Sequence, residues 1–147
     1  MERADPVLIL AANGSAQILV SSLLGVFMLV PLQPWAKAKG SLLWARGNAK
    51  ALLAVHLDLL MLAFMQFAAA FVLGRWPLAR GHTIAWLLVF GGWVNPSPYL
   101  FRALGINAFV LGGPWPQRLA AGLGGVSVLS ILTAWTLVLA ALLPLLG

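Results

Sequence analysis

The sequence predicts an all-α fold, an integral membrane four-helix bundle that forms a single domain over residues 1–147. Of the 147 residues, 62% are hydrophobic and only 8% are charged, with a mean hydropathy of +0.98. These values are typical of membrane proteins and not of soluble domains. Four apolar stretches are long enough to cross a hydrocarbon core of about 30 Å, which takes about 20 residues in a helix. The short connections between them leave no room for a soluble domain, so we expect one compact bundle.

The four predicted spans follow one another along the chain. We place them at Val7–Val30, Ala51–Leu73, Thr83–Leu104 and Leu119–Leu146. The first is interpreted as a retained span and not as a signal peptide, because its apolar run exceeds the roughly 7–15 residues of a signal-peptide core. The residues before it also mix acidic and basic side chains.

The three connections differ in composition. Residues Pro31–Asn48 mix tryptophans with basic side chains, the composition of an interfacial anchor, and we expect them to lie along the membrane surface. The second connection is short and contains Pro77 and Gly81. The third, Gly105–Arg118, has closely spaced glycines and prolines, so we expect it to be irregular. Irregular backbone at membrane depth needs cover from protein or a water-filled cavity, which makes this segment a candidate lid.

The net charge of +6 comes from basic residues near the span ends and in the loops, where they meet lipid headgroups. We therefore expect the lipid bilayer as a partner and no nucleic acid. The side of the first and third connections carries more of these residues, so the positive-inside rule places both termini outside the cytoplasm. That side has Lys37, Lys39, Arg46, Lys50, Arg102 and Arg118, and the other side has Arg3, Arg75 and Arg80.

Two ionisable side chains, His56 and Asp58, lie inside the second predicted span. An Asp at a helix centre costs about 2.5–3.5 kcal/mol on insertion scales, so such residues need a reason to be there. Being two residues apart on a helix, they point to different faces and do not pair. Asp58 is interpreted as a structural hydrogen-bonding residue, with proton transfer as the alternative. His82 precedes the third span, and we expect it to be exposed or interfacial.

His56 has two interpretations. As a neutral imidazole it can bond a carbonyl of a neighbouring helix. Alternatively it is the axial ligand of a b-type haem, because one histidine can hold haem iron but cannot hold a bare zinc ion. The chain contains no cysteine, which excludes thiol chemistry, thiolate metal sites and covalent c-type haem but not a non-covalent haem.

The segment GGWVNPSPYLF (Gly91–Phe101) places two prolines and three polar side chains in the third predicted span. Pro96 and Pro98 lack an amide donor and clash with the carbonyl four residues back. We therefore expect the helix to kink or open near Gly92–Val94.

Asn95 and Tyr99 lie four residues apart in this segment and are expected to share one face of the helix. In one interpretation Asn95 repairs the broken backbone and Tyr99 anchors the helix at the interface. In the other, the two side chains line a cavity for an aromatic molecule, which the flanking rings of Trp93 and Phe101 favour.

The chain resembles the styrene oxide isomerase and hydroxylaminobenzene mutase family of small four-span membrane proteins. One part of the resemblance is the opening of the second span, NAKALLAVHLDLLMLAF (Asn48–Phe64). In the first span, Asn13-Gly14 followed by Gly25 is similar to the His-Gly and later Gly of styrene oxide isomerases. In the third span the similar residues are Gly92, Trp93, Asn95, Tyr99, Leu100 and Phe101.

The resemblance implies a homo-oligomer, a trimer, that binds ferric haem b near its subunit interfaces and uses the iron as a Lewis acid. A small aromatic epoxide would rearrange to an aldehyde, or an aryl hydroxylamine to an aminophenol, and neither reaction changes the net redox state. His56 would be the axial haem ligand. Asn95 and Tyr99 would be the catalytic residues that position and polarise the substrate oxygen. The implied location is the bacterial cytoplasmic membrane.

The sequence departs from the family pattern at Leu62, where the family has an asparagine six residues after its histidine. One polar contact to substrate is then missing. A second alignment, on Trp44–Arg46, would place Asn48 at the histidine position, and we prefer His56 because the apolar span begins around it. Two other functions stay open: a proton-coupled multidrug-type transporter that uses Asp58, and a catalytically silent assembly subunit.

Overall fold

The computed structural model describes residues 4–30, 33, 49–110 and 112–146. All regular structure within these residues is helical, which confirms the predicted all-α fold. The elements are α1 (Pro6–Leu29), α4 (Ala49–Arg75), α5 (Gly81–Val94), α6 (Ser97–Ala103), α7 (Trp115–Leu142) and a short 3-10 helix, η2 (Leu143–Leu145). The predicted surface segment Pro31–Asn48 lies outside the described residues except for Gln33, and so does the alternative alignment on Trp44–Arg46.

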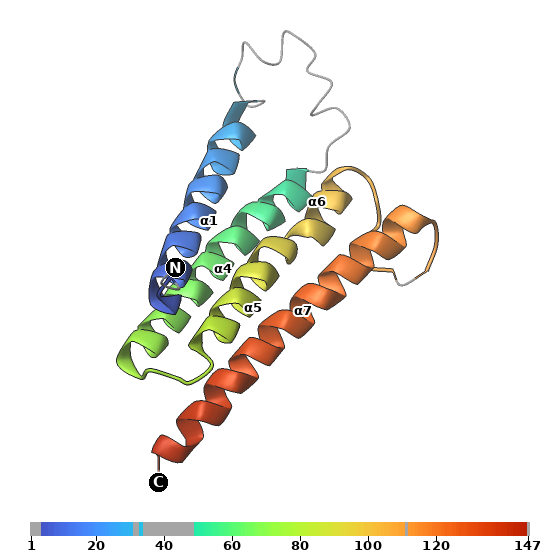
Figure 1. Cartoon of the computed structure of the whole chain (residues 1–147). Coiled ribbons are helices and arrows are strands. Elements are labelled where there is room, and N and C mark those ends of the chain that lie inside the picture. Colours follow the sequence, from blue (N-terminus) through green and yellow to red (C-terminus); the bar gives the residue numbers. More distant parts are fainter. Residues whose placement is uncertain (1–3, 31–32, 34–48, 111, 147) are drawn as a thin grey trace.

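Three helical segments are long and apolar enough to cross a membrane, namely Pro6–Leu29, Ala49–Arg75 and Trp115–Leu145. At about 1.5 Å per residue, the 24 residues of the first reach about 36 Å. The third predicted span is divided into α5 and α6, of 14 and 7 residues, which continue along one line in Figure 1. Each is too short to cross alone, so a fourth crossing requires the pair.

The helix starts follow from capping side chains and prolines. The Asp5 carboxylate accepts a hydrogen bond from the Val7 N–H at 2.9 Å, and Pro6 occupies the first turn of α1. Extended backbone at Pro114 opens α7, which has Pro116 in its first turn. Helix α7 therefore begins at Trp115, four residues before the predicted Leu119, because proline is tolerated in a first turn.

The helices alternate in direction, with α5 and α6 together as the third member (Figure 1). Helix α1 packs mainly on α4, and α5 packs mainly on α7. The hydrophobic core lies toward the end of the bundle where the α4–α5 turn is found. Its buried members are Leu10, Ala69, Ala70, Leu73, Ile84, Ala85, Leu88, Ala134 and Val138. The alanines let the helices approach closely, as is common in membrane bundles.

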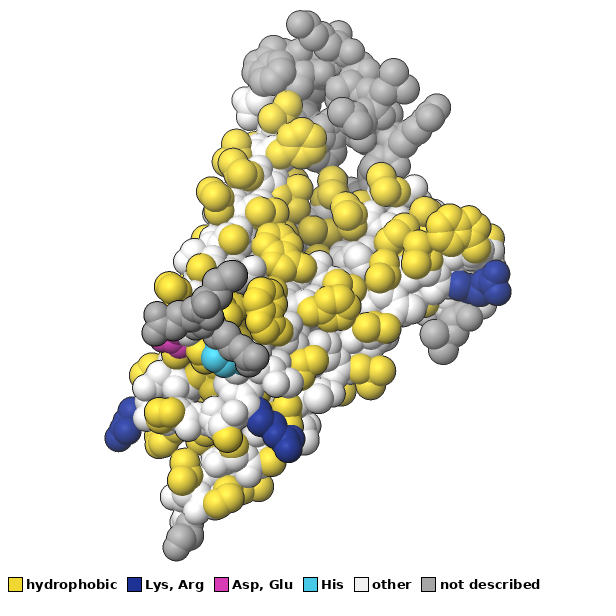
Figure 2. Space-filling model, in the orientation of Figure 1, with side chains coloured by type: hydrophobic (Ala, Val, Ile, Leu, Met, Phe, Trp, Pro, Cys, Tyr) yellow, Lys and Arg dark blue, Asp and Glu magenta, His cyan; other side chains and the backbone are white. Residues whose placement is uncertain are grey.

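The outer surface of the bundle is rich in large apolar side chains. Phe71, Met61 and Leu129 are 71%, 67% and 66% exposed. Figure 2 shows such side chains spread over the face in view, with basic side chains toward its edges. A soluble monomer rarely exposes apolar patches of this extent, whereas lipid tails cover them at no cost. The surface therefore fits the membrane class that the composition predicts.

Candidate active site

The third span breaks where its backbone first loses a hydrogen-bond donor. The Asn95 N–H still donates to the Gly91 carbonyl at 2.9 Å, so helical bonding continues to the end of α5. Pro96 has no N–H, and α6 begins after it at Ser97. The predicted interruption is therefore confirmed, but its predicted position at Gly92–Val94 is wrong. A proline removes the bond at its own amide, and the turn before it stays wound.

A buried glutamine replaces the hydrogen bond that Pro96 cannot make. In an unbroken helix the Gly92 carbonyl would accept from the N–H of residue 96. Here it accepts from Nε2 of Gln17, on α1, at 2.7 Å, and Gln17 is fully buried. A Cβ added at Gly92 would lie 2.7 Å from Nε2 of Gln66. Glycine at this position thus lets side-chain amides reach the backbone beside the break.

Gln17 belongs to a chain of amides that joins α1, α4 and α5. Nε2 of Gln66 donates to Oε1 of Gln17 at 2.7 Å, and Nδ2 of Asn13 donates to Oε1 of Gln66 at 2.9 Å. Nε1 of Trp93 donates to Oδ1 of Asn13 at 2.9 Å. The two glutamines were not predicted from the sequence to be part of the site. Their presence inside otherwise apolar spans would have indicated an interhelical hydrogen bond, because a polar group in hydrocarbon needs a partner.

The Asn95 side chain is held between α4 and α7. Its Nδ2 donates to Oδ2 of Asp58 at 2.8 Å. The hydroxyl of Ser127 lies 3.2 Å from Oδ1 of Asn95 and 2.9 Å from the Gly91 carbonyl oxygen, and it can donate to either. Asp58 thus has the structural hydrogen bond that the sequence predicts for it, with a partner that the sequence did not identify.

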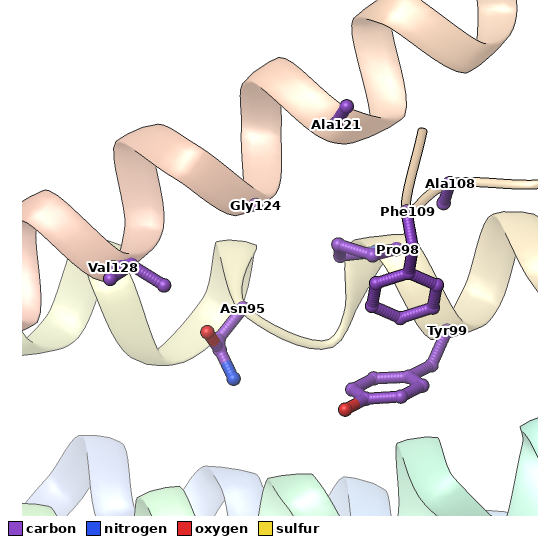
Figure 3. A pocket seen from close by; sticks show the side chains of 8 residues that line it. All are labelled: Asn95, Pro98, Tyr99, Ala108, Phe109, Ala121, Gly124 and Val128. Carbon is purple, nitrogen blue, oxygen red and sulfur yellow. The ribbon is translucent and has the colours of Figure 1, made fainter. Parts of the chain in front are cut away.

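A cavity of about 290 Å³ lies beside the break, between α5, α6, α7 and the loop after α6 (Figure 3). Asn95 and Tyr99 both line it, as their spacing predicts. Trp93 and Phe101, the rings expected to flank it, are not among its lining residues. The remaining lining residues are Pro98, Ala108, Phe109, Ala121, Gly124 and Val128. Small residues on α7 leave the space open, since a Cβ at Gly124 would come within 2.9 Å of Cγ of Pro98.

The loop after α6 supplies the aromatic ring that the prediction assigned to Trp93 and Phe101. The rings of Phe109 and Tyr99 are 5.2 Å apart and inclined by 58°, an arrangement that aromatic pairs favour. The Arg102 guanidinium lies 5.8 Å from the centre of the Phe109 ring. Gly105, with φ +84°, turns the chain back toward the cavity. The expected irregular segment is thus present, although it ends at Pro114 and not at Arg118.

His56 lies between α4 and α1, where Ser21 fixes its ring. Nδ1 is 2.8 Å from the Ser21 carbonyl oxygen and 2.9 Å from the Ser21 hydroxyl. That hydroxyl donates to the His56 carbonyl at 2.7 Å. The arrangement is satisfied when Nδ1–H donates to the Ser21 carbonyl, which leaves Nε2 with a free lone pair.

Gly25 provides the space in which the His56 ring lies. A Cβ added at Gly25 would come within 3.1 Å of Cε1 of His56. His56 is not among the residues that line the cavity of Asn95 and Tyr99. Within one chain, the histidine and the two other predicted site residues therefore belong to different parts of the bundle.

The other predicted positions lie outside both parts. His82 lies at the start of α5, and its Nε2 is 3.0 Å from the Ala4 carbonyl oxygen. Leu62, at the position of the family's asparagine, is a buried apolar side chain. Within the described ranges, no three His, Asp or Glu residues gather into a group that could hold a bare metal ion.

The family model described as styrene oxide isomerase matches residues 8–143. No curated protein and no solved structure matched the chain. The matched range covers α4, α5, α6, α7 and the lining residues of the cavity, together with nearly all of α1. The chain therefore belongs to the styrene oxide isomerase family.

Proposed function

We propose that the protein is a membrane-embedded isomerase that rearranges a small aromatic epoxide to an aldehyde. Rearrangement of an aryl hydroxylamine to an aminophenol is the alternative. The observation that carries the proposal is the cavity that joins the Asn95 carboxamide, the Tyr99 phenol and the Phe109 ring. Its volume is near the lower end of the roughly 300–1,000 Å³ of ligand sites, which favours a small substrate. Family membership supports isomerase-like chemistry.

Asn95 and Tyr99 are the donors that we assign to the substrate oxygen. The Tyr99 hydroxyl has no hydrogen-bond partner within the described residues, so its proton is available. Asn95 keeps one Nδ2 hydrogen after its bond to Asp58. As the benzylic C–O bond opens, negative charge grows on the oxygen, and both donors bind it more strongly than in the ground state.

The remaining walls of the cavity favour rearrangement over hydrolysis. Breaking the C–O bond leaves an electron-poor benzylic carbon. A hydrogen then moves with its electron pair from the oxygen-bearing carbon to that centre, and the oxygen closes the C=O bond. Water would intercept the electron-poor carbon. The rings of Tyr99 and Phe109, with Pro98 and Val128, present mainly apolar surface around the reacting atoms.

His56 fits the role of axial ligand to haem b. Its Nδ1 is anchored by Ser21, so Nε2 is the free nitrogen, and the absence of a side chain at Gly25 leaves room for the ring. Metal-binding histidines commonly donate their other N–H to a carbonyl in this way. Ferric haem b bound through Nε2 would supply a Lewis acid for the substrate oxygen.

A homo-oligomer would reconcile the two separate parts of the site. His56 faces α1, whereas Asn95 and Tyr99 face the cavity beside α7. We propose that neighbouring copies, in a trimer, bring the histidine of one chain toward the cavity of another. The proposed setting is the bacterial cytoplasmic membrane, where an apolar substrate is dissolved in the lipid bilayer.

The proposal is tested by expressing the protein with ample haem, purifying it in detergent, and identifying the product that it forms from styrene oxide. We expect phenylacetaldehyde by gas chromatography and a Soret band in the absorption spectrum. The double variant Tyr99→Phe/Asn95→Ala should keep the Soret band and lose most turnover, because removing one such donor costs about 10²–10³ in rate. Wild-type turnover in the double variant would refute the roles of these residues. A wild-type protein that rearranges neither epoxide nor hydroxylamine would refute the function.

A further inference from the structure

The Asn95 carboxamide has two chemically different partners at the break between α5 and α6. On the α4 side, Nδ2 lies 2.8 Å from Oδ2 of Asp58. On the α7 side, Oδ1 lies 3.2 Å from the buried hydroxyl of Ser127. A carboxamide can occupy this position in two orientations, which exchange its oxygen and its nitrogen.

Only one of the two partners distinguishes these orientations. The Ser127 hydroxyl donates or accepts, so it tolerates either end of the amide. An ionised Asp58 only accepts, so in that state it requires the nitrogen on its side. Turning the amide over would place Oδ1 of Asn95 against a carboxylate oxygen at hydrogen-bond distance, which is repulsive. The carboxylate therefore decides which end of the amide faces α4.

We propose that Asp58 is a positioning residue for the isomerisation: it orients Asn95 so that the second Nδ2 hydrogen is available in the cavity, near the Tyr99 hydroxyl. Figure 3 shows the nitrogen of Asn95 and the hydroxyl of Tyr99 on the same side of the cavity. The proposal rests on the function proposed above. In the reverse orientation, Asn95 would offer an oxygen where the substrate oxygen needs a donor.

Three variants test the proposal. Asp58→Leu removes the acceptor, and we expect kcat for styrene oxide to fall about 10- to 100-fold, the equivalent of one hydrogen bond to a charged group. The exchange Asp58→Asn/Asn95→Asp keeps a donor and an acceptor between the two positions. Ser130→Ala is the matched control, because it removes a buried interhelical bond, to the Leu87 carbonyl at 2.8 Å, away from the cavity.

The exchange separates positioning from simple stabilisation. It should recover the melting temperature lost in Asp58→Leu, while kcat stays low because residue 95 then presents an acceptor to the substrate. Ser130→Ala should lower the melting temperature and leave kcat within about twofold of wild type. If the exchange recovers kcat together with the melting temperature, the bond is only structural and the proposal is wrong.

A second measurement does not depend on turnover. The chain has four asparagines, Asn13, Asn48, Asn95 and Asn107, so ¹⁵N-asparagine labelling gives few side-chain amide signals. The Asn95 pair is identified by its loss in Asn95→Ala. In Asp58→Leu this pair should shift or broaden, while the Asn13 pair should not. An unchanged Asn95 pair would overturn the proposal. This result is decisive even if wild-type protein converts no epoxide, an outcome that would defeat the proposed function separately.

Discussion

The hydrogen bond from Gln17 to the Gly92 carbonyl predicts a measurable loss of stability when the glutamine is replaced. Gln17→Leu removes two bonds, the one to Gly92 and the one accepted from Gln66. Side-chain hydrogen bonds in membrane proteins contribute about 0.6 kcal/mol on average and up to about 1.7 kcal/mol. Two of them correspond to about 1 to 3 kcal/mol. We expect the upper half of this range, because Pro96 leaves the carbonyl without its helical partner.

The free energy of unfolding can be measured by denaturant titration of purified protein in mixed micelles, followed by circular dichroism. Gln66→Leu supplies the second corner of a double-mutant cycle. Because the two glutamines share one bond, the sum of the two single-variant losses of unfolding free energy should exceed the loss of the double variant by about 0.6 to 1.7 kcal/mol. A loss below about 0.5 kcal/mol for Gln17→Leu would refute the assignment of Gln17 as the replacement partner of the broken helix. Strictly additive losses would refute the hydrogen bond between the two glutamines.

Three further predictions concern the two parts of the site. His56→Ala should abolish or greatly shift the Soret absorption, and His82→Ala should leave it intact; a spectrum that His56→Ala does not alter would exclude axial ligation by this residue. Gly25→Val should weaken haem binding in a haem titration, because even a Cβ there lies 3.1 Å from the His56 ring, and wild-type affinity would contradict the packing. Phe109→Ala should raise KM for an aromatic epoxide about threefold to tenfold, because the substrate ring would lose an aromatic partner in the cavity, with a smaller change for an aliphatic epoxide of similar size; equal changes would show that the Phe109 ring does not recognise the substrate.

The features that were predicted correctly depend on residues close together in the sequence. Apolar runs of sufficient length predict helices, and two prolines predict a break in one of them. The spacing of four between Asn95 and Tyr99 places both side chains on one face of the third span, since α6 continues along the line of α5. Each of these inferences needs only the geometry of a single helix. The break lies at Asn95 and Pro96, one to two residues after the predicted Gly92–Val94, because the hydrogen bond of Asn95 to Gly91 survives.

The features that were missed depend on pairing between helices. Asp58 and Asn95 are 37 residues apart, and Gln17 and Gly92 are 75 apart. No feature of the local sequence determines which face of α4 contacts α5. The partner of a buried carboxylate or amide is therefore known only once the packing of the helices is known. Trp93 illustrates the same limit. Its position beside Asn95 suggested a cavity ring, but its indole donates to Asn13 on α1.

The polar residues around the break form two separate sets of hydrogen bonds. One set bonds the backbone of the break and the other bonds the Asn95 side chain, and this separation explains how the site can be both stable and able to bind a substrate. On one side, Gln17 donates to the Gly92 carbonyl that Pro96 leaves free, so this carbonyl needs no partner from the cavity. On the other side, Asp58 and Ser127 bond one hydrogen and the oxygen of Asn95, and the second Nδ2 hydrogen stays unused. A break repaired by Asn95 itself would leave no donor for a substrate. Because the repair comes from α1, the side chains at the break are available for chemistry.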